Sequence, residues 1–132
     1  HVPVNSLSGG QRQRAWIAMV LAQDADIILM DEPVNHLDMK YQYAVLDLVR
    51  RLGQEHGKTI ITVLHDLNLA SAFADHVVMV RQGKAGICGP TKQVITPENI
   101  RMVFDFDADV FMREDRLVCL PRQDAQMRAN AE

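Results

Sequence analysis

Two adjacent carboxylates follow a short apolar stretch in the first third of the chain. Asp31 and Glu32 come directly after residues 27–30. A short unbroken apolar run predicts a strand buried on both faces of a parallel α/β sheet, and ligands bind such sheets at the carboxyl ends of the strands. One carboxylate can hold hydrated Mg²⁺ while the other orients or deprotonates an attacking water. The alternative is that Asp31 caps the next turn and Glu32 is simply solvated.

A histidine occupies the corresponding place after a second predicted strand. Residues 59–64 are β-branched and apolar, and a predicted helix over 39–54 would make a right-handed crossover between two parallel strands. Parallel strands end at the same sheet edge, so we expect His65 to lie beside Asp31 and Glu32. A lone histidine is often structural, but this position favours a role in chemistry.

A glycine-rich segment opens the first predicted helix, which runs through residue 22. Ser8 and Gln11 have the spacing of a capping box. Gly9 and Gly10 each cost the helix about 1 kcal/mol relative to alanine, a loss that makes sense if a ligand approaches the backbone closely. Free N–H groups at a helix start suit a phosphate. The alternative is a well-capped helix without a ligand.

The remaining elements must hold these residues in place. The helix over 39–54 follows a polar turn and should end at Gly57, with an apolar stripe at helical spacing formed by Val45, Leu48, Val49 and Leu52. Later signals predict a helix over 67–74 capped by Asp66, strands over 76–80 and through 88 joined by a turn at 81–84, a helix from 97 to about 104, and a hairpin over 108–113 and 116–120.

Composition narrows the class of protein. The chain has 132 residues, 48% of them hydrophobic, which fits one domain or part of one. A net charge of −3 without a basic run argues against nucleic acid as the main partner. Cys88 and Cys119 lack a CxxC spacing, so we expect reduced thiols. The longest apolar run, 15–22, is far shorter than the roughly 18 residues of a membrane span. The chain begins at His1, as if cut from something longer.

Four motifs in order resemble the ATP-binding subunit of ABC transporters over nearly the whole chain. Residues 7–11 (LSGGQ) resemble the signature motif, 27–32 the Walker B segment, 35–38 (NHLD) the D-loop, and His65 the switch histidine. The resemblance implies an α/β partial P-loop NTPase fold and an ATPase that uses ATP and Mg²⁺.

The resemblance implies a role for each site residue. Asp31 would hold Mg²⁺ through water, Glu32 would polarise the attacking water, and His65 would contact the γ-phosphate and link it to Glu32. In this family the signature motif closes over ATP bound by the opposite subunit of a head-to-tail dimer. Asp38 would help to align that interface, and the residues that would bind nucleotide in trans are Ser8, Gly9, Gly10 and Gln11.

The family's P-loop, G-x-x-x-x-G-K-[ST], does not occur in the sequence. Residues 57–59 (GKT) imitate its end, but Leu52 stands where the first glycine belongs, and the triplet precedes a strand. We therefore expect the C-terminal part of an ABC ATPase domain over 1–104, without the P-loop strand, then a small α+β extension with its β part over 105–121, and a polar tail over 122–132. An exposed apolar sheet edge, poor solubility and no ATP hydrolysis above background should follow.

Two runs, 14–24 and 63–70, resemble the importer subfamily for ferric siderophores, haem and cobalamin, and a siderophore is the first expectation. Such a subunit would work on the cytoplasmic face of the cell membrane with a permease and, indirectly, a substrate-binding protein. One alternative is a non-catalytic module that modulates an intact ABC ATPase. Another is an ABC-F translation factor fragment, but those proteins usually carry Ser-His-Asp-Arg where residues 64–67 read Leu-His-Asp-Leu.

Overall fold

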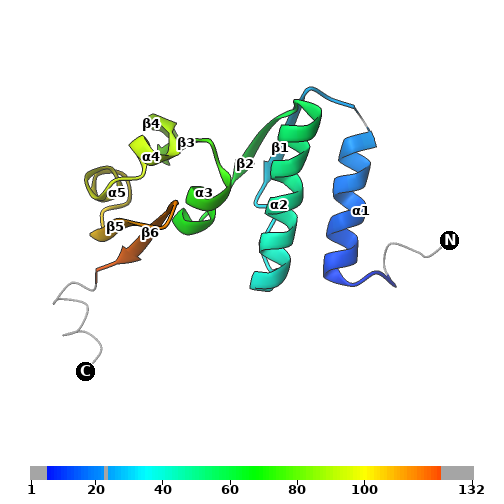
Figure 1. The fold of residues 1–132 in the computed structure, drawn as a ribbon, viewed down its shortest axis with the longest axis horizontal. Helices are drawn as coiled ribbons and strands as arrows, with labels where there is room; N and C mark the ends of the chain where they lie inside the picture. The colour runs from blue at the N-terminus through cyan, green and yellow to red at the C-terminus, as the bar shows by residue number, and fades with distance from the viewer. Residues whose placement is uncertain (1–5, 23, 123–132) are drawn as a thin grey trace. The chain divides into compact units, whose positions relative to one another are not determined.

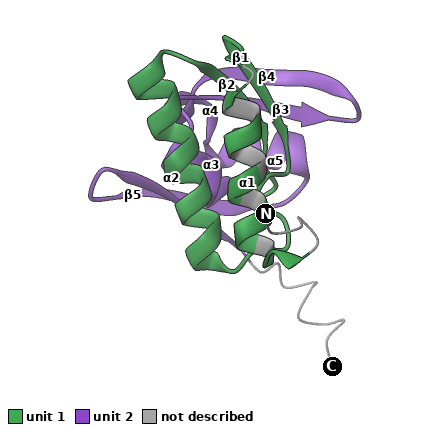
Figure 2. Cartoon of the chain, turned by 90° about the vertical axis from the view of Figure 1, so that its right-hand side faces the viewer, with its two compact units in different colours: residues 1–65 green, residues 66–132 purple. Residues whose placement is uncertain are grey.

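The computed structural model describes residues 6–22 and 24–122, and its fold is drawn in Figure 1. The chain forms two compact units, residues 1–65 and 66–132, which Figure 2 colours separately. The predicted functional division at residues 104 and 121 stays a prediction, and the tail beyond residue 122 lies outside the described residues. No helix in the described ranges is long and apolar enough to cross a membrane.

The first unit contains a parallel pair of strands joined through a helix. Its elements are α1 (Gly9–Ala22), β1 (Ile27–Asp31), α2 (Met39–His56) and β2 (Thr59–Val63). Strands β1 and β2 are parallel and in register from Ile27 opposite Thr59 to Asp31 opposite Val63, which confirms the predicted pairing. Helix α2 ends at Gly57, whose left-handed φ of 63° suits glycine, again as predicted.

Strand β1 is buried on one face only. Ile28 and Met30 are 3% and 2% exposed, whereas Ile27 and Leu29 are 59% and 70% exposed. The prediction of a strand buried on both faces is therefore wrong in this structure, because the described residues pack against only one side of the β1–β2 sheet. Helix α2 buries most of its predicted stripe, with Leu46 replacing the half-buried Leu48; its buried residues are Val45, Leu46, Val49 and Leu52.

The second unit combines two hairpins with three short helices. Its elements are α3 (Leu67–Phe73), β3 (His76–Arg81), β4 (Lys84–Pro90), α4 (Thr91–Val94), α5 (Pro97–Phe104), β5 (Ala108–Arg113) and β6 (Arg116–Pro121). Strand β3 pairs antiparallel with β4, and β5 with β6. The expected strands and helices are confirmed to within a few residues at each end, and α4 is an element that the sequence did not reveal.

Local sequence signals explain where these elements begin. The Asp66 carboxylate accepts the backbone N–H groups of Asn68 and Leu69 at 2.7 and 3.1 Å, so Asp66 caps α3 as predicted. Thr96 caps α5, with proline at its first turn. The β3–β4 turn places Gln82 and Gly83 at φ of 51° and 72°, both in the left-handed region.

The core of the second unit surrounds α5. Ile100 is completely buried, and Cys119 of β6 is 3% exposed. Burial raises the pKa of the Cys119 thiol, whereas Cys88 is exposed. The Asn68 side-chain oxygen accepts the Cys119 backbone N–H at 2.8 Å, and the Asn68 amide donates to the Cys119 carbonyl at 3.1 Å. These two bonds tie α3 to β6. The buried cluster consists of Met79, Val94, Ile95, Ile100, Val103, Ala108 and Cys119.

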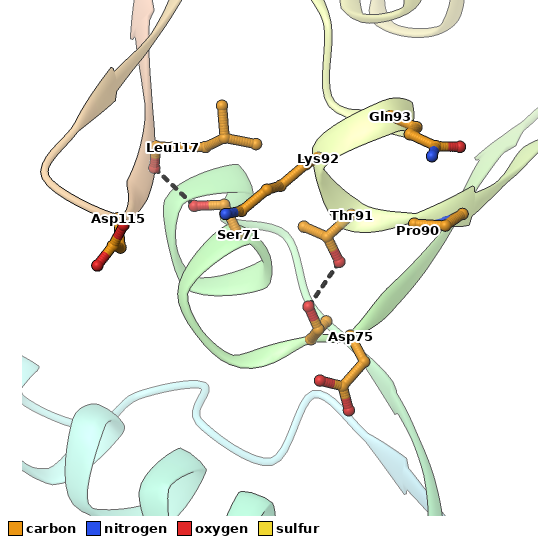
Figure 3. Close-up of a pocket in the computed structure, with 9 residues that line it drawn as sticks. Ser71, Asp75, Pro90, Thr91, Lys92, Gln93, Asp115 and Leu117 are labelled. Atoms are coloured by element: carbon orange, nitrogen blue, oxygen red, sulfur yellow. Dashed lines mark hydrogen bonds between the residues drawn. The ribbon is translucent and has the colours of Figure 1, made fainter.

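A hollow of about 410 Å³ lies in this unit where α3, α4 and the β5–β6 turn meet (Figure 3). The Ser71 hydroxyl donates to the Leu117 carbonyl at 2.8 Å, and the Thr91 hydroxyl donates to the Ala74 carbonyl at 2.5 Å. Both hydroxyls that line the hollow therefore serve to hold neighbouring elements together.

Candidate active site

The parallel strands of the first unit bring the predicted acid and histidine together. Asp31 ends β1 directly opposite Val63, which ends β2. Glu32 and His65 follow those ends, and the imidazole Nε2 of His65 hydrogen-bonds Glu32 Oε1. The expected meeting of these two side chains at one sheet edge is confirmed.

The Glu32 carboxylate is held on both of its oxygens. While Oε1 meets His65, Oε2 accepts the side-chain N–H of Asn35. The Asn35 backbone N–H also donates to the Glu32 carbonyl at 3.2 Å, closing a turn. Glu32 itself has a φ of 47°, a left-handed conformation that costs a non-glycine residue about 1–2 kcal/mol. The alternative in which Glu32 is merely solvated is therefore wrong.

Asn35 is a residue whose contact the sequence analysis missed. In the sequence, Asn35 is only the first position of the D-loop-like run 35–38. The sequence does contain a signal for this contact. Asn35 lies three residues after Glu32 across a turn that contains a proline, and this spacing allows the amide to face back toward the carboxylate.

The charge of Glu32 changes the protonation of His65. Through their hydrogen bond and then through its charge, Glu32 raises the pKa of His65 above the ordinary value of 6.5, and Asp31 adds a smaller effect of the same sign. The His65 side chain is 67% exposed, so solvent screens the pair.

Replacing Glu32 by glutamine should lower the pKa of His65 toward 6.5, because a neutral amide removes the carboxylate's charge. The pKa is raised in the folded state, so the stabilisation by the pair is complete below pH 6.5 and is lost as pH rises through the folded-state pKa. NMR titration of the histidine ring protons in both proteins measures the shift. The remaining histidines are internal controls, and an unchanged His65 midpoint in Glu32→Gln would contradict the pairing.

The glycine-rich segment forms the expected capping box. The Ser8 backbone N–H donates to Gln11 Oε1 at 3.0 Å, and the Gln11 N–H donates to Ser8 Oγ at 3.3 Å. Packing also favours glycine at position 10, because a Cβ atom there would lie 3.3 Å from the ring of Tyr41. Gly9 begins α1. Within the described part of the chain, no hydrogen bond or ion pair joins Ser8 or Gln11 to the Glu32–His65 pair.

The two remaining predicted site residues lie at the ends of elements. Asp31 is exposed at the end of β1, and Asp38 precedes α2 without a side-chain capping bond. No group of three or more metal-ligating side chains occurs among residues 6–22 and 24–122. Mg²⁺ commonly takes one or two carboxylates and completes its shell with water and substrate phosphates. A single exposed carboxylate at Asp31 fits that kind of site.

The P-loop-like triplet is not a phosphate-binding loop. Gly57 caps the C-terminal end of α2, and Thr59 begins β2. Lys58 Nζ pairs with Asp24 at 2.8 Å and Asp26 at 3.8 Å. The triplet therefore joins a helix to a strand, as expected from the sequence.

Comparisons with known proteins agree with the motifs. A family model described as ABC transporter matches residues 1–35. The achromobactin transport ATP-binding protein CbrD of Dickeya dadantii (strain 3937) is 47% identical over 131 residues, covering 96% of this chain and 49% of CbrD. The iron(3+)-hydroxamate import ATP-binding protein FhuC of Bacillus subtilis (strain 168) is 42% identical over 120 residues, covering 89% of this chain and 45% of FhuC.

A solved structure extends the agreement to three dimensions. A metal-chelate type ABC transporter in an inward-facing conformation matches with a TM-score of 0.81 at 29% identity, covering 91% of this chain and 50% of that one. The fold and the residues at its strand ends define part of an α/β ATPase domain of the P-loop NTPase class. The chain belongs to the ABC transporter family of ATP-binding proteins. It spans about half the length of the curated relatives that it matches.

Proposed function

We propose that this chain supplies the water-activating part of the ATP-hydrolysing subunit of an ABC importer. The observation that carries the proposal is the contact between Glu32 and His65, two side chains that follow adjacent parallel strands. A carboxylate oriented by an imidazole is the arrangement that a general base needs to act on water.

Each residue at the sheet edge has a distinct task in this proposal. Glu32 accepts the proton of the attacking water, or orients that water toward the γ-phosphorus. His65 keeps the carboxylate in place and donates from its ring to a γ-phosphate oxygen. Asp31 holds Mg²⁺, which would neutralise charge on the phosphates when bound.

The glycine-opened helix has its task in trans. Ser8, Gly9, Gly10 and Gln11 cover the nucleotide held by a second ABC ATPase subunit, and Asp38 aligns the two subunits head to tail. This arrangement is supported by the chemistry of the segment: Ser8 and Gln11 cap the start of α1, and a helix start presents N–H groups suited to a phosphate.

The transported cargo is proposed from the relatives. CbrD is named for achromobactin transport and FhuC for iron(3+)-hydroxamate import, so we infer a ferric siderophore as the cargo. The subunit would act at the cytoplasmic face of the cell membrane with a permease, which in turn receives cargo from a substrate-binding protein.

The 132-residue chain by itself should release phosphate from ATP at no more than the blank rate, because its sequence contains no P-loop motif to cradle the phosphates. A phosphate-release assay with Mg²⁺ and ATP checks this. Hydrolysis above the blank that disappears in Glu32→Gln would contradict it, and hydrolysis that persists in that variant would indicate a contaminant.

A second candidate function is a non-catalytic module that pairs with an intact ABC ATPase. The capped glycine helix favours it, since that surface is formed here without a P-loop. Measuring the ATP turnover of an intact relative such as CbrD with and without this chain distinguishes the module from the catalytic part of an importer subunit. A saturable change in turnover that is lost in Gly10→Ala, where a Cβ would press against Tyr41, would support the module.

A further inference from the structure

The second oxygen of Glu32 is bound by a residue that none of the assigned roles uses. Asn35 Nδ2 donates to Glu32 Oε2, and the Asn35 backbone N–H donates to the Glu32 carbonyl at 3.2 Å. Two bonds from one residue thus meet the same glutamate, one at its backbone and one at its carboxylate. Together with His65 at Oε1, they restrain the carboxylate from both sides.

We propose that Asn35 is a positioning residue for Glu32: its side-chain amide fixes the carboxylate in the orientation that presents Oε1 to His65. The proposal rests on the proposed function, since a fixed carboxylate matters for hydrolysis only if Glu32 acts on water. Asn35 does not touch the reacting atoms in this role and acts only through Glu32.

The chemistry of an amide suits this task. An asparagine side chain donates a hydrogen bond without bringing a positive charge, so it orients the carboxylate without forming an ion pair with it. Each carboxylate oxygen has about two lone-pair sites, so both oxygens can still accept a bond from water while Asn35 and His65 are bound. The restraint is also needed, because Glu32 has an unfavourable left-handed φ of 47° and its side chain is 37% exposed.

Spectroscopy of the nucleotide-free chain tests the proposal. The readouts are the ¹⁵N resonance of His65 Nε2 at one fixed pH and the side-chain amide protons of Asn35. Three proteins are compared with the unmodified chain: Glu32→Gln, which sets the unpaired position of His65, and Asn35→Ala and Asn35→Leu, which remove the donor. Leucine has nearly the shape of asparagine, so it separates loss of the donor from loss of bulk. His36→Asn is the control in the same turn, since asparagine tolerates the left-handed φ of 61° there.

In both Asn35 variants the His65 Nε2 resonance should move most of the way to its position in Glu32→Gln, while His36→Asn leaves it in place. The Asn35 amide protons should shift in Glu32→Gln. The proposal is overturned if the His65 Nε2 resonance stays at its original position in Asn35→Ala or Asn35→Leu. It is also overturned if the His65 Nε2 resonance does not move in Glu32→Gln. If one Asn35 variant does not fold, as judged by circular dichroism, the other decides. No ATP is present, so this result is independent of whether the proposed hydrolysis holds.

Discussion

The substitution Glu32→Gln should lower phosphate release about a hundredfold or more in a chimera in which this chain replaces the matched segment of CbrD. Glutamine has the size of glutamate, but its side chain is an uncharged amide that cannot accept a proton from water. The loss should therefore appear in kcat, with little change in the KM for ATP. Steady-state phosphate release at several ATP concentrations measures both.

The control for this experiment is Glu55→Gln, which removes the same charge from an exposed position on α2 and should leave the rate unchanged. If the Glu32→Gln chimera hydrolyses ATP at the rate of the unsubstituted chimera, Glu32 is not the residue that activates water. If the unsubstituted chimera folds and binds ATP but does not hydrolyse it, the proposed function is wrong.

The substitution Ile100→Ala should destabilise the second unit by about 2–5 kcal/mol, because it deletes buried methyl groups and leaves a cavity that the surroundings fill only partly. Ile100 is 0% exposed at the centre of the core. The buried thiol of Cys119 reports on this unit, since it should react with a disulfide reagent only after the unit opens. In a Cys88→Ser background, urea-dependent labelling of Cys119 gives the change in unfolding free energy.

Met102→Ala is the matched control, since it shortens a 60% exposed side chain on the same helix and should change the stability by no more than about 0.5 kcal/mol. Equal effects of the two substitutions would mean that Ile100 is not buried in solution. Fast labelling of Cys119 in the unsubstituted chain without urea would show that the second unit does not close around β6.

Short-range signals predicted much of the fold, because their physics is local. A carboxylate or hydroxyl just before a helix accepts hydrogen bonds from the free N–H groups of the first helical turn in almost any surroundings. Asp66, Thr96 and the Ser8–Gln11 pair cap their helices in this way. The meeting of Glu32 with His65 was predictable for a similar reason. Two parallel strands joined by one helix must end at the same edge, whatever surrounds them.

Packing across the sheet could not be predicted in the same way. The apolar run of β1 indicated burial on both faces, but whether a face is covered depends on which other elements pack against it, and Leu29 is 70% exposed. Gly10 looked like a ligand contact in sequence, yet the ring of Tyr41, 31 positions away, also restricts that position.

The sequence by itself determined which residues end the strands, which residues cap the helices, and that an acid and an imidazole share one edge. Only the tertiary structure decided that Asn35 turns back onto the second oxygen of Glu32. That contact depends on the path of the turn, set by the left-handed backbone of Glu32 and the bond from the Asn35 N–H to its carbonyl. Residue types and spacing allow such a turn without requiring it, because a loop takes its conformation from the sum of contacts that hold it.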